Sequence, residues 1–445
     1  MTNILPHRFD VLNISMADRL AVKSILVIQA KYIGDVILTS ALMRNLRVAY
    51  PHAIMAMLCA PGLRDLVVSQ SIADIAIGFD PRGGGRSLTR RLKEYSSLVA
   101  ELRRRKFDLT IDLTDSKTSR IIHKLIGAPM RVGYDPPEVP LKSWESQPAN
   151  IFAETFGQGG AHYLYRYLSP LRALGITSSE VTPRLEPTSI GRGASTQILA
   201  QSNLNAKAFV AVHAGARFEG RCWQPERFAA VIDEVYETTG LRSLLIGGPD
   251  ESAIAQRILN VAVNPLASVV GKASLETLTA LLADAFIFLG NESGPMHLAA
   301  SVGTPVVGLY GLTPPDVWGP VGVPYRTVEP PLPCQCVAPH LCKPNNPGGV
   351  YCVHRLPVAK VAQATHELIE AVRQQGNASV NSPFSRRRRA DPPIGSGSEP
   401  VAVMTSASAV RVLGKIVLQR SHRLALLHAP RLAREARRDG AAKAA

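Results

Sequence analysis

The sequence predicts an α/β protein with two layered domains of similar size. Short apolar runs rich in β-branched residues alternate with segments whose apolar residues recur at helical spacing. This alternation stops and then restarts near the middle of the 445-residue chain. A chain of that length has room for two domains, and a hydrophobic content of 46% is enough to give each domain a core.

The first domain is expected at residues 24–185, after an N-terminal extension at 1–23. It opens with SILVIQA, a run typical of a buried parallel strand. GDVILTSALMRNLRVAYP continues with apolar residues at helical spacing as far as Pro51, and SLTRRLKEYSSLVAELRRR predicts a second, more polar helix. Further strands are expected at 53–58, 74–79 and 108–113.

The second domain is expected at 196–375, after a linker that contains Pro and Ser near 177–195. Its strands are expected at 208–214, 242–248, 267–270, 285–290 and 305–311. Its helices are expected to begin near Pro225, Asp250, Ser274 and Ser293, and one more follows Pro357. Because open α/β sheets bind ligands at the carboxyl ends of their strands, the cleft between two such domains is the expected ligand site.

The last segment, 376–445, is expected to be a flexible basic tail. It holds 13 of the 50 Lys and Arg residues but only 4 of the 35 Asp and Glu residues, so the body is mildly basic and suits an anionic substrate. Residues 409–428 carry apolar and basic residues on largely opposite helical faces, which suits either an anionic membrane surface or packing on the body or a partner. The run SRRRR has no interleaved aromatic residues, so no nucleic-acid partner is expected.

The chain shows no targeting or spanning segment. No apolar run approaches the roughly 18 residues of a transmembrane helix, and the N-terminus lacks the layout of a signal peptide, so we expect a cytoplasmic protein. Four cysteines cluster in the pattern C-x-C-x5-C-x9-C: Cys334, Cys336, Cys342 and Cys352. Four thiols could bind zinc or an iron–sulfur cluster, but paired C-x-x-C knuckles are missing. Their role stays open, and we expect neither a metal nor a cofactor.

Gly34 and Asp35 stand where the first strand turns into its helix, a position that faces the cleft in open α/β sheets. Asp is a common helix cap, so capping is one role for Asp35. A carboxylate general base is the other.

The second domain offers a candidate anion site in HAGARFEGRCWQPERFAAVI. A glycine-bearing loop from Gly215 leads to Arg221 and then to Pro225 at the expected first turn of a helix. Loop amides, the helix N-terminus and Arg221 would together hold an anion. Trp223 is expected to serve packing.

Two further strand ends carry acids. In IGGPDESAIAQ, Asp250 or Glu251 opens a helix, and either residue could cap that helix or bind ribose hydroxyls.

In GNESGPMHLAAS, Ser293 is expected to cap a helix whose free N–H groups suit phosphate. Gly294 would let the phosphate approach closely, and Glu292 should point elsewhere, for instance to a sugar hydroxyl. His297 lies in the first turn of the same helix.

The order of these motifs resembles glycosyltransferase family nine, the ADP-heptose:lipopolysaccharide heptosyltransferases. The likeness covers roughly Ser24 to Gln375 and rests on ILVIQAKYIGDVILTSALMRNLRVAYP, HAGARFEGRCWQPERF and VVGKASLETLTALLADAFIFLGNESGPMHLAASVGTPVVGLYGLTPPDVWGP. It implies a GT-B fold, in which a first Rossmann-like domain holds mainly the acceptor and a second holds the nucleotide-sugar.

The resemblance also implies an inverting, metal-independent transfer, most simply of heptose from ADP-heptose to a lipid-linked lipopolysaccharide core acceptor at the inner membrane. It makes Asp35 the proposed base, and it maps the family's other site residues onto Arg221, Glu292, Ser293, Gly294 and His297. Arg221 is also expected to act in catalysis by stabilising the leaving diphosphate. Gly215, Asp250 and Glu251 join the expected donor site on the residue pattern described above. Arg221 stands where the family usually has Lys, and Glu292 stands where it usually has Asp. These two departures leave the donor sugar open.

Two other functions compete with transfer. A GT-B-like nucleotide-sugar epimerase or hydrolase would release free nucleotide without an acceptor. A non-catalytic sugar-nucleotide-binding protein would need no base in the cleft, so Asp35 argues against it.

Overall fold

The computed structural model describes residues 21–81, 87–137, 140–141, 148–154, 162–311, 313–331 and 351–381. Two six-stranded sheets, in which every pairing is parallel, lie in the compact unit Met1–Val380. The two sheets have the same strand order. In each sheet, the second and third strands lie on one side of the first strand, and the fourth, fifth and sixth lie on the other side. That order places a topological switch point beside the first strand of each sheet, where ligands bind in such folds.

The first sheet has the order β3-β2-β1-β4-β5-β6. Its strands are β1 (Ser24–Gln29), β2 (Ile54–Cys59), β3 (Ile75–Gly78), β4 (Leu109–Asp112), β5 (Met130–Asp135) and β6 (Ile151–Glu154). β1 lies between β2 and β4, with Ile25 paired to Met55 on one side and to Leu109 on the other.

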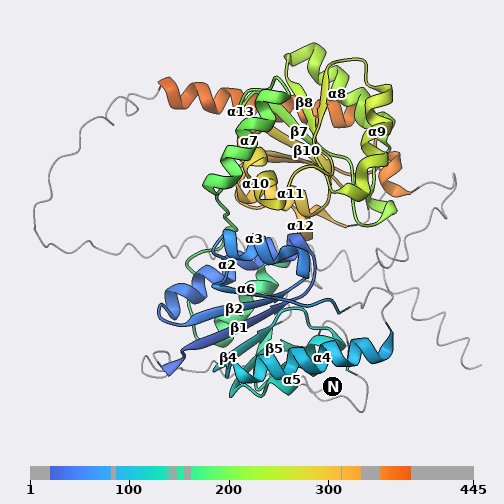
Figure 1. Ribbon diagram of the computed structural model, residues 1–445. Helices are drawn as coiled ribbons and strands as arrows, with labels where there is room; N and C mark the ends of the chain where they lie inside the picture. Colours follow the sequence, from blue (N-terminus) through green and yellow to red (C-terminus); the bar gives the residue numbers. More distant parts are fainter. Residues whose placement is uncertain are drawn as a thin grey trace, which may run out of the picture. The chain divides into compact units, whose positions relative to one another are not determined.

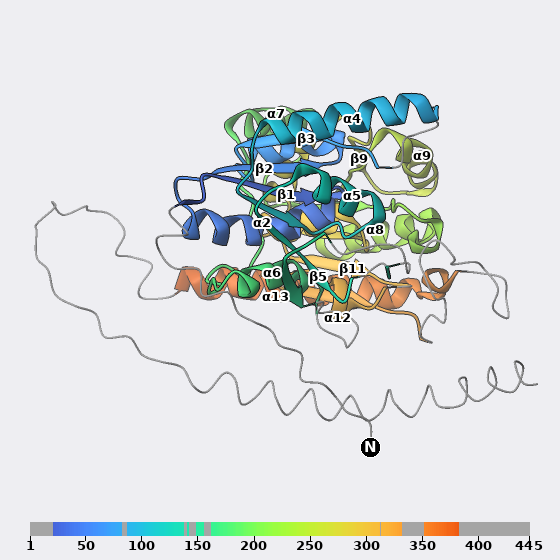
Figure 2. The ribbon, with the colours of Figure 1, turned by 90° about the horizontal axis from the view of Figure 1, so that it is seen from below.

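Helices cover both faces of the first sheet, which explains why its central strands are buried and largely apolar. Ile25 and Val27 pack towards α2 (Ile33–Ala49), α3 (Arg64–Ser69) and α6 (Tyr163–Ala173). Leu26 and Ile28 point the other way, towards α4 (Leu88–Arg104) and α5 (Lys117–Ile126). Figure 1 shows these two groups of helices on opposite sides of the strands, and Figure 2 shows the sheet from the side of α4 and α5.

The second sheet has the order β12-β11-β10-β7-β8-β9. Its strands are β7 (Phe209–His213), β8 (Arg242–Leu245), β9 (Leu266–Ser268), β10 (Ile287–Asn291), β11 (Val306–Leu309) and β12 (Tyr325–Val328). β7 and β10 are neighbours at its switch point, with Gly290 paired to His213.

Helices also cover both faces of the second sheet. One face carries α7 (Ser189–Gln201), α10 (Leu275–Asp284) and α11 (Gly294–Ser301). The other carries α8 (Pro225–Thr239), α9 (Ser252–Val261) and α13 (Val358–Asn381). A short helix, α12 (Pro315–Trp318), follows β11. α8 begins with Pro225 and ends at Gly240, whose φ of +73° is the left-handed conformation that favours glycine at a helix end.

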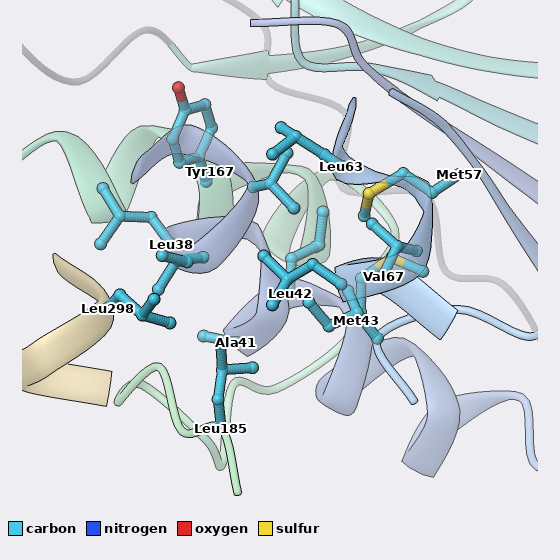
Figure 3. Close-up of a cluster of buried hydrophobic side chains, with 14 of the residues drawn as sticks. Leu38, Ala41, Leu42, Met43, Met57, Leu63, Val67, Tyr167, Leu185 and Leu298 are labelled. Carbon is cyan, nitrogen blue, oxygen red and sulfur yellow. The ribbon is translucent and has the colours of Figure 1, made fainter. Parts of the chain in front are cut away.

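We call the first sheet with its helices the first layer, and the second sheet with its helices the second layer. One apolar cluster runs without a break from α2 of the first layer to α11 of the second layer. Figure 3 shows Leu298 of α11 beside Leu38 of α2, and Leu185 beside Ala41. The backbone N–H of Leu185 also donates to the carbonyl oxygen of Ser301 at 3.0 Å. The elements that carry the predicted site residues are therefore fixed against each other by buried apolar surface.

Every strand expected from the sequence is present, and its ends are displaced by at most three residues. The strands β5, β6 and β12 were not expected. β6 and β12 are short edge strands, and β5 is interrupted by a glycine and followed by Pro136, so none of the three gives a strong apolar run. The expected linker near 177–195 is helical from Ser189 onward, and the domain boundaries themselves stay a prediction.

Candidate active site

A buried asparagine fixes the loops at the switch point of the second sheet. Asn291 ends β10, and its side-chain amide donates to the carbonyl oxygens of Ala214 at 2.7 Å and Gly215 at 3.3 Å. Its Oδ1 accepts from the backbone N–H of Trp223 at 3.1 Å. Trp223 is fully buried and donates its indole N–H to the carbonyl oxygen of Leu356, which confirms its packing role. The loop after β7 is thus tied to the strand that precedes Glu292.

Half-buried Arg221 and buried Glu292 form an ion pair across this edge. The guanidinium Nη1 lies 2.8 Å from Glu292 Oε2, and Thr313 donates its hydroxyl to the same oxygen at 2.7 Å. Burial raises the pKa of Glu292, while Arg221 and Thr313 act to lower it. The described side-chain partners of the Glu292 carboxylate are Arg221 and Thr313. Arg221 and Glu292, the two residues that differ from the types implied by the family resemblance, are therefore in contact with each other.

His213, which the sequence did not single out, joins two predicted donor residues. It is buried at the end of β7, with Nδ1 3.1 Å from the Ser293 hydroxyl oxygen and Nε2 3.1 Å from Glu251 Oε1. Ser293 occupies the N-cap position of α11, but its side chain makes no capping hydrogen bond. The histidine thus links the N-terminal end of α11 to the acid that follows β8.

Two glycines make room for the Glu251 carboxylate, and a third donates a hydrogen bond to it. A Cβ atom on Gly215 would overlap Glu251 Oε1, and one on Gly247 would overlap Oε2. The backbone N–H of Gly248 donates to Oε2 at 2.7 Å. Burial acts to raise the pKa of Glu251, but the bonds from His213 and Gly248 outweigh it and lower that pKa, so the carboxylate stays ionised. Asp250 is exposed, and no hydrogen bond or ion pair of its side chain is present among the described residues.

Asp35 is buried in the first turn of α2. The N-cap residue is Tyr32, so Asp35 does not occupy the cap position itself. Its Oδ2 accepts from the backbone N–H of Tyr32 at 3.1 Å, and its Oδ1 accepts from the hydroxyl of Tyr167. The carboxylate therefore supports the helix start and also faces a second helix, α6.

The first turns of α2 and α11 touch through two glycines. A Cβ atom on Gly294 would overlap the Ile33 methyl Cγ2, and one on Gly34 would lie 2.9 Å from the His297 ring. The space beside Gly294, which the sequence assigned to a phosphate, is filled by Ile33 in this structure. Both glycines instead allow two helix N-termini to approach closely.

His297 is buried and uncharged. Burial lowers its pKa to about 3, with smaller contributions from the positive charges of His162 and Arg221. Its Nε2 is buried and has no hydrogen-bond partner among the described residues. A neutral imidazole can donate or accept one hydrogen bond at that atom, so His297 is able to contact a polar group of a ligand.

Aromatic rings connect α6 of the first layer to α12 of the second. The Tyr163 and Trp318 rings stack with centroids 4.3 Å apart, and Tyr163 meets Tyr167 edge-on at 5.2 Å. His162 Nε2 lies 2.9 Å from the carbonyl oxygen of Gly319. These contacts place a second junction between the layers next to Asp35.

A buried charge network at the end of β4 was also not anticipated. Asp115 pairs with Arg120 and Arg166, in both cases at 3.1 Å, and the Arg166 guanidinium lies 3.7 Å from the centre of the Tyr134 ring. Burial raises the pKa of the neighbouring Asp112 to about 7. The pair of Asp115 with Arg166 could not be predicted from the sequence, because these two residues lie 51 positions apart.

The described residues contain no group of three or more His, Cys, Asp or Glu side chains placed to hold a metal ion. Cys352 is buried, whereas the other three clustered cysteines lie outside the described residues. The segment expected to be a flexible tail, 376–445, is helical at its start, because α13 continues to Asn381, and the rest of it lies outside the described residues. Within the described ranges, no helix has both the length and the apolar character needed to cross a membrane.

The structure thus brings most of the predicted residues to one region. Gly34 and Asp35 come from the first layer, and the second layer supplies residues that the sequence predicts to bind the donor: Gly215, Arg221, Glu251, Glu292, Ser293, Gly294 and His297. Such a region can offer a carboxylate base, a guanidinium and helix amides to one substrate.

Comparison with known proteins also indicates a glycosyltransferase. Residues 95–342 match the sequence profile of the family described as "Glycosyltransferase family 9 (heptosyltransferase)". The Escherichia coli K12 protein named lipopolysaccharide heptosyltransferase 3 is 27% identical over 301 residues, which span 65% of this chain and 83% of that protein.

Two solved structures share the fold. The glycosyl transferase family 9 protein from Veillonella parvula has a TM-score of 0.66 and 21% identity, over 80% of this chain and 100% of its own. The E. coli structure titled ADP-heptose lps heptosyltransferase II has a TM-score of 0.62 and 20% identity, over 78% of this chain and 99% of its own. The fold is therefore the GT-B arrangement of two Rossmann-like units, as the resemblance implied.

The glycine contact between α2 and α11 predicts a coupled pair of substitutions. We expect Gly294→Ala to destabilise the protein by about 1–3 kcal/mol, because the new methyl group overlaps Ile33. Ile33→Ala should remove most of that penalty, so that the double variant is more stable than additivity allows in urea unfolding.

A matched control for this pair is Gly193→Ala in α7, where an added Cβ meets no atom within 4 Å. It should leave stability unchanged or raise it slightly. Strictly additive costs of Gly294→Ala and Ile33→Ala would contradict the proposed contact.

The Arg221–Glu292 pair predicts a loss of stability that depends on pH. We expect Arg221→Ala to cost about 3–5 kcal/mol at pH 7, because it leaves a buried carboxylate without its cation. The pKa of Glu292 is already raised above its ordinary 4.5 and should rise further. Between those two pKa values the folded variant binds more protons than the unfolded chain, so its free energy of unfolding should increase as pH falls.

The control for Arg221→Ala is Arg257→Ala. Arg257 pairs with Glu226 at 2.7 Å, but both side chains are well exposed, so the cost should be roughly 1 kcal/mol or less. Equal costs for the two variants, or a cost of Arg221→Ala that does not change between pH 5 and pH 8, would show that the Glu292 carboxylate does not depend on Arg221.

Proposed function

Because the chain belongs to glycosyltransferase family 9 (heptosyltransferase) and is thus a glycosyltransferase, we propose that it adds a sugar to the core of lipopolysaccharide. The donor that we propose is ADP-heptose, and the transfer is inverting and independent of a metal ion. The names of the E. coli relatives, which include lipopolysaccharide and ADP-heptose, support this choice of substrates.

The observation that carries the proposal is the position of Asp35. Its carboxylate is buried at the N-terminus of α2, and that helix start lies against the start of α11 through Gly34 and His297. Asp35 is thus the sequence neighbour of Gly34, which lies against His297, one of the residues proposed to hold the donor. This is the arrangement that a direct displacement between an acceptor hydroxyl and a sugar-nucleotide requires.

In the proposed reaction, Asp35 accepts the proton of an acceptor hydroxyl while that oxygen attacks the anomeric carbon. The new bond to the sugar forms on the face opposite the leaving group, so the configuration at the anomeric carbon inverts. The bond from the anomeric carbon to the phosphate oxygen breaks, and its electron pair leaves with ADP.

Arg221 and the α11 amides are proposed to stabilise the leaving diphosphate. A guanidinium has five N–H donors, and Nη1 of Arg221 is used by Glu292, so further donors can reach a phosphate. Glu292 would keep the guanidinium in place. Since Pro295 has no N–H, the amides of Gly294 and of the residues after Pro295 would supply the helix contribution.

His213 is proposed to position two residues that bind different parts of the nucleotide. It holds Ser293 near the diphosphate end and Glu251 near the ribose end. Glu251, ionised and surrounded by glycines, could exchange its bond from Gly248 for ribose hydroxyls. Exposed Asp250 is a less favourable candidate for that role.

The acceptor is proposed to be a lipid-linked glycan, which the enzyme would meet at the cytoplasmic face of the inner membrane. Contact with an anionic membrane is part of this proposal, and the basic tail is the segment suited to it. The acceptor would lie beside Gly34 and Asp35 on the first layer.

The central test is Asp35→Asn, which removes the base but keeps the size of the side chain. We expect transfer from ADP-heptose to fall by about 10²–10⁴-fold, while ADP still binds in calorimetry. Asp65→Asn is the matched control, because Asp65 also lies in a first helical turn but is exposed. Near wild-type transfer by Asp35→Asn would refute the mechanism. Rapid release of free ADP without an acceptor would favour a hydrolase instead.

A further inference from the structure

Tyr167 makes a contact that the proposed mechanism has not used. It lies in α6, is fully buried, and donates its hydroxyl to Oδ1 of Asp35. Figure 3 shows its ring at the rim of the apolar cluster, with the hydroxyl oxygen pointing away from that cluster. A phenylalanine would fill the same apolar space, so the hydroxyl itself requires an explanation.

The bond to Tyr167 complements a second bond on the same carboxylate. Oδ2 of Asp35 accepts from the backbone N–H of Tyr32 at 3.1 Å, so both oxygens of the carboxylate accept hydrogen bonds. Two donors on different oxygens fix the plane of the carboxyl group. A carboxylate offers about four lone-pair positions, so it can accept both bonds and an acceptor hydroxyl at the same time.

The position of the Tyr167 hydroxyl is itself set by neighbouring rings. Tyr163 packs edge-on against Tyr167 and stacks on Trp318 with an interplanar angle of 19°. Trp318 belongs to α12, so this stack reaches into the second layer. Burial raises the pKa of Tyr167 well above 10, and the Asp35 charge raises it further, so the hydroxyl keeps its proton and acts as a donor.

We infer that Tyr167 is a positioning residue for the general base, and that its hydroxyl holds the Asp35 carboxylate in the orientation that accepts the acceptor proton. This inference rests on the proposed function, because it takes Asp35 to be the base. Tyr167 itself transfers no proton. Its bond favours the ionised form of the carboxylate over the protonated form, and its loss should therefore make the base easier to protonate.

Several ionisable groups border this pair, and they come from different elements: Glu292 after β10, His297 of α11, Tyr134 of β5, Tyr163 of α6, and Lys31, which donates to Tyr163. The charges of Asp35 and Glu292 influence each other. The fall in activity at low pH, called the acid limb of the pH profile, therefore reflects a coupled set of groups. Only a comparison of variants that differ by one hydroxyl isolates the part that Tyr167 contributes.

The experiment is the pH dependence of kcat/KM for full-length Tyr167→Phe, with ADP-heptose and a lipopolysaccharide core acceptor. We expect the acid limb to move up by about one pH unit, so that activity below the limb falls about tenfold. The affinity for ADP should not change. Replacing Tyr167 by 3-fluorotyrosine, which is a stronger donor of nearly the same shape, should move the limb in the opposite direction.

The matched control is Tyr134→Phe. Tyr134 is as deeply buried and also donates its hydroxyl at 3.0 Å, but to the backbone carbonyl of Arg166. It should lose stability without moving the acid limb. An unchanged limb in Tyr167→Phe, or an equal shift in Tyr134→Phe, would overturn the inference.

A double variant separates this inference from the proposed function. In an Asp35→Ala background, Tyr167→Phe should cause no further loss of the residual rate, because its partner is gone. If Asp35→Asn is inactive and Tyr167→Phe keeps the wild-type pH profile, only the positioning role fails. If Asp35→Asn is fully active, the base assignment fails and the positioning role fails with it.

Discussion

The contact between the first turns of α2 and α11 is the constraint on which the rest of the site depends. Ile33 lies against Gly294, and His297 lies against Gly34, so neither helix start can carry a side chain at its glycine without moving the other. The helix starts follow β1 and β10, the strands beside the two switch points. Packing between two glycines therefore sets the separation of the proposed base from the proposed donor residues.

Burial decides the charge states around that contact. His297 is held neutral because charging it in the interior is costly, whereas Glu292 is buried beside a guanidinium and a hydroxyl. The Glu292 carboxylate meets the planar guanidinium of Arg221, whose remaining donors point in fixed directions. The two residues that differ from the types implied by the family resemblance therefore belong to one ion pair.

Sequence alone was sufficient for features that are local in the chain. The strand before Asp35 and the strand before Glu292 follow from apolar runs, and the helix starts follow from Gly, Ser and Pro. The contacts of these residues could not be predicted, because they depend on partners far away in sequence. Ile33 against Gly294 spans the two layers, and the hydroxyl of Tyr167 reaches Asp35 from α6. A tyrosine in an apolar helix gives no sign of a polar partner until the fold is known.

Asp35 lies between two junctions of different chemistry. On one side, glycines bring α2 against α11, and on the other, rings carry contact from Tyr167 through Tyr163 to Trp318. The first junction fixes the backbone that bears the carboxylate, and the second fixes a donor to that carboxylate. Both include residues of the second layer, so the orientation of the base depends on the layer that is proposed to bind the donor. If Asp35 is the base, as proposed, its alignment with a bound sugar-nucleotide depends on both junctions together.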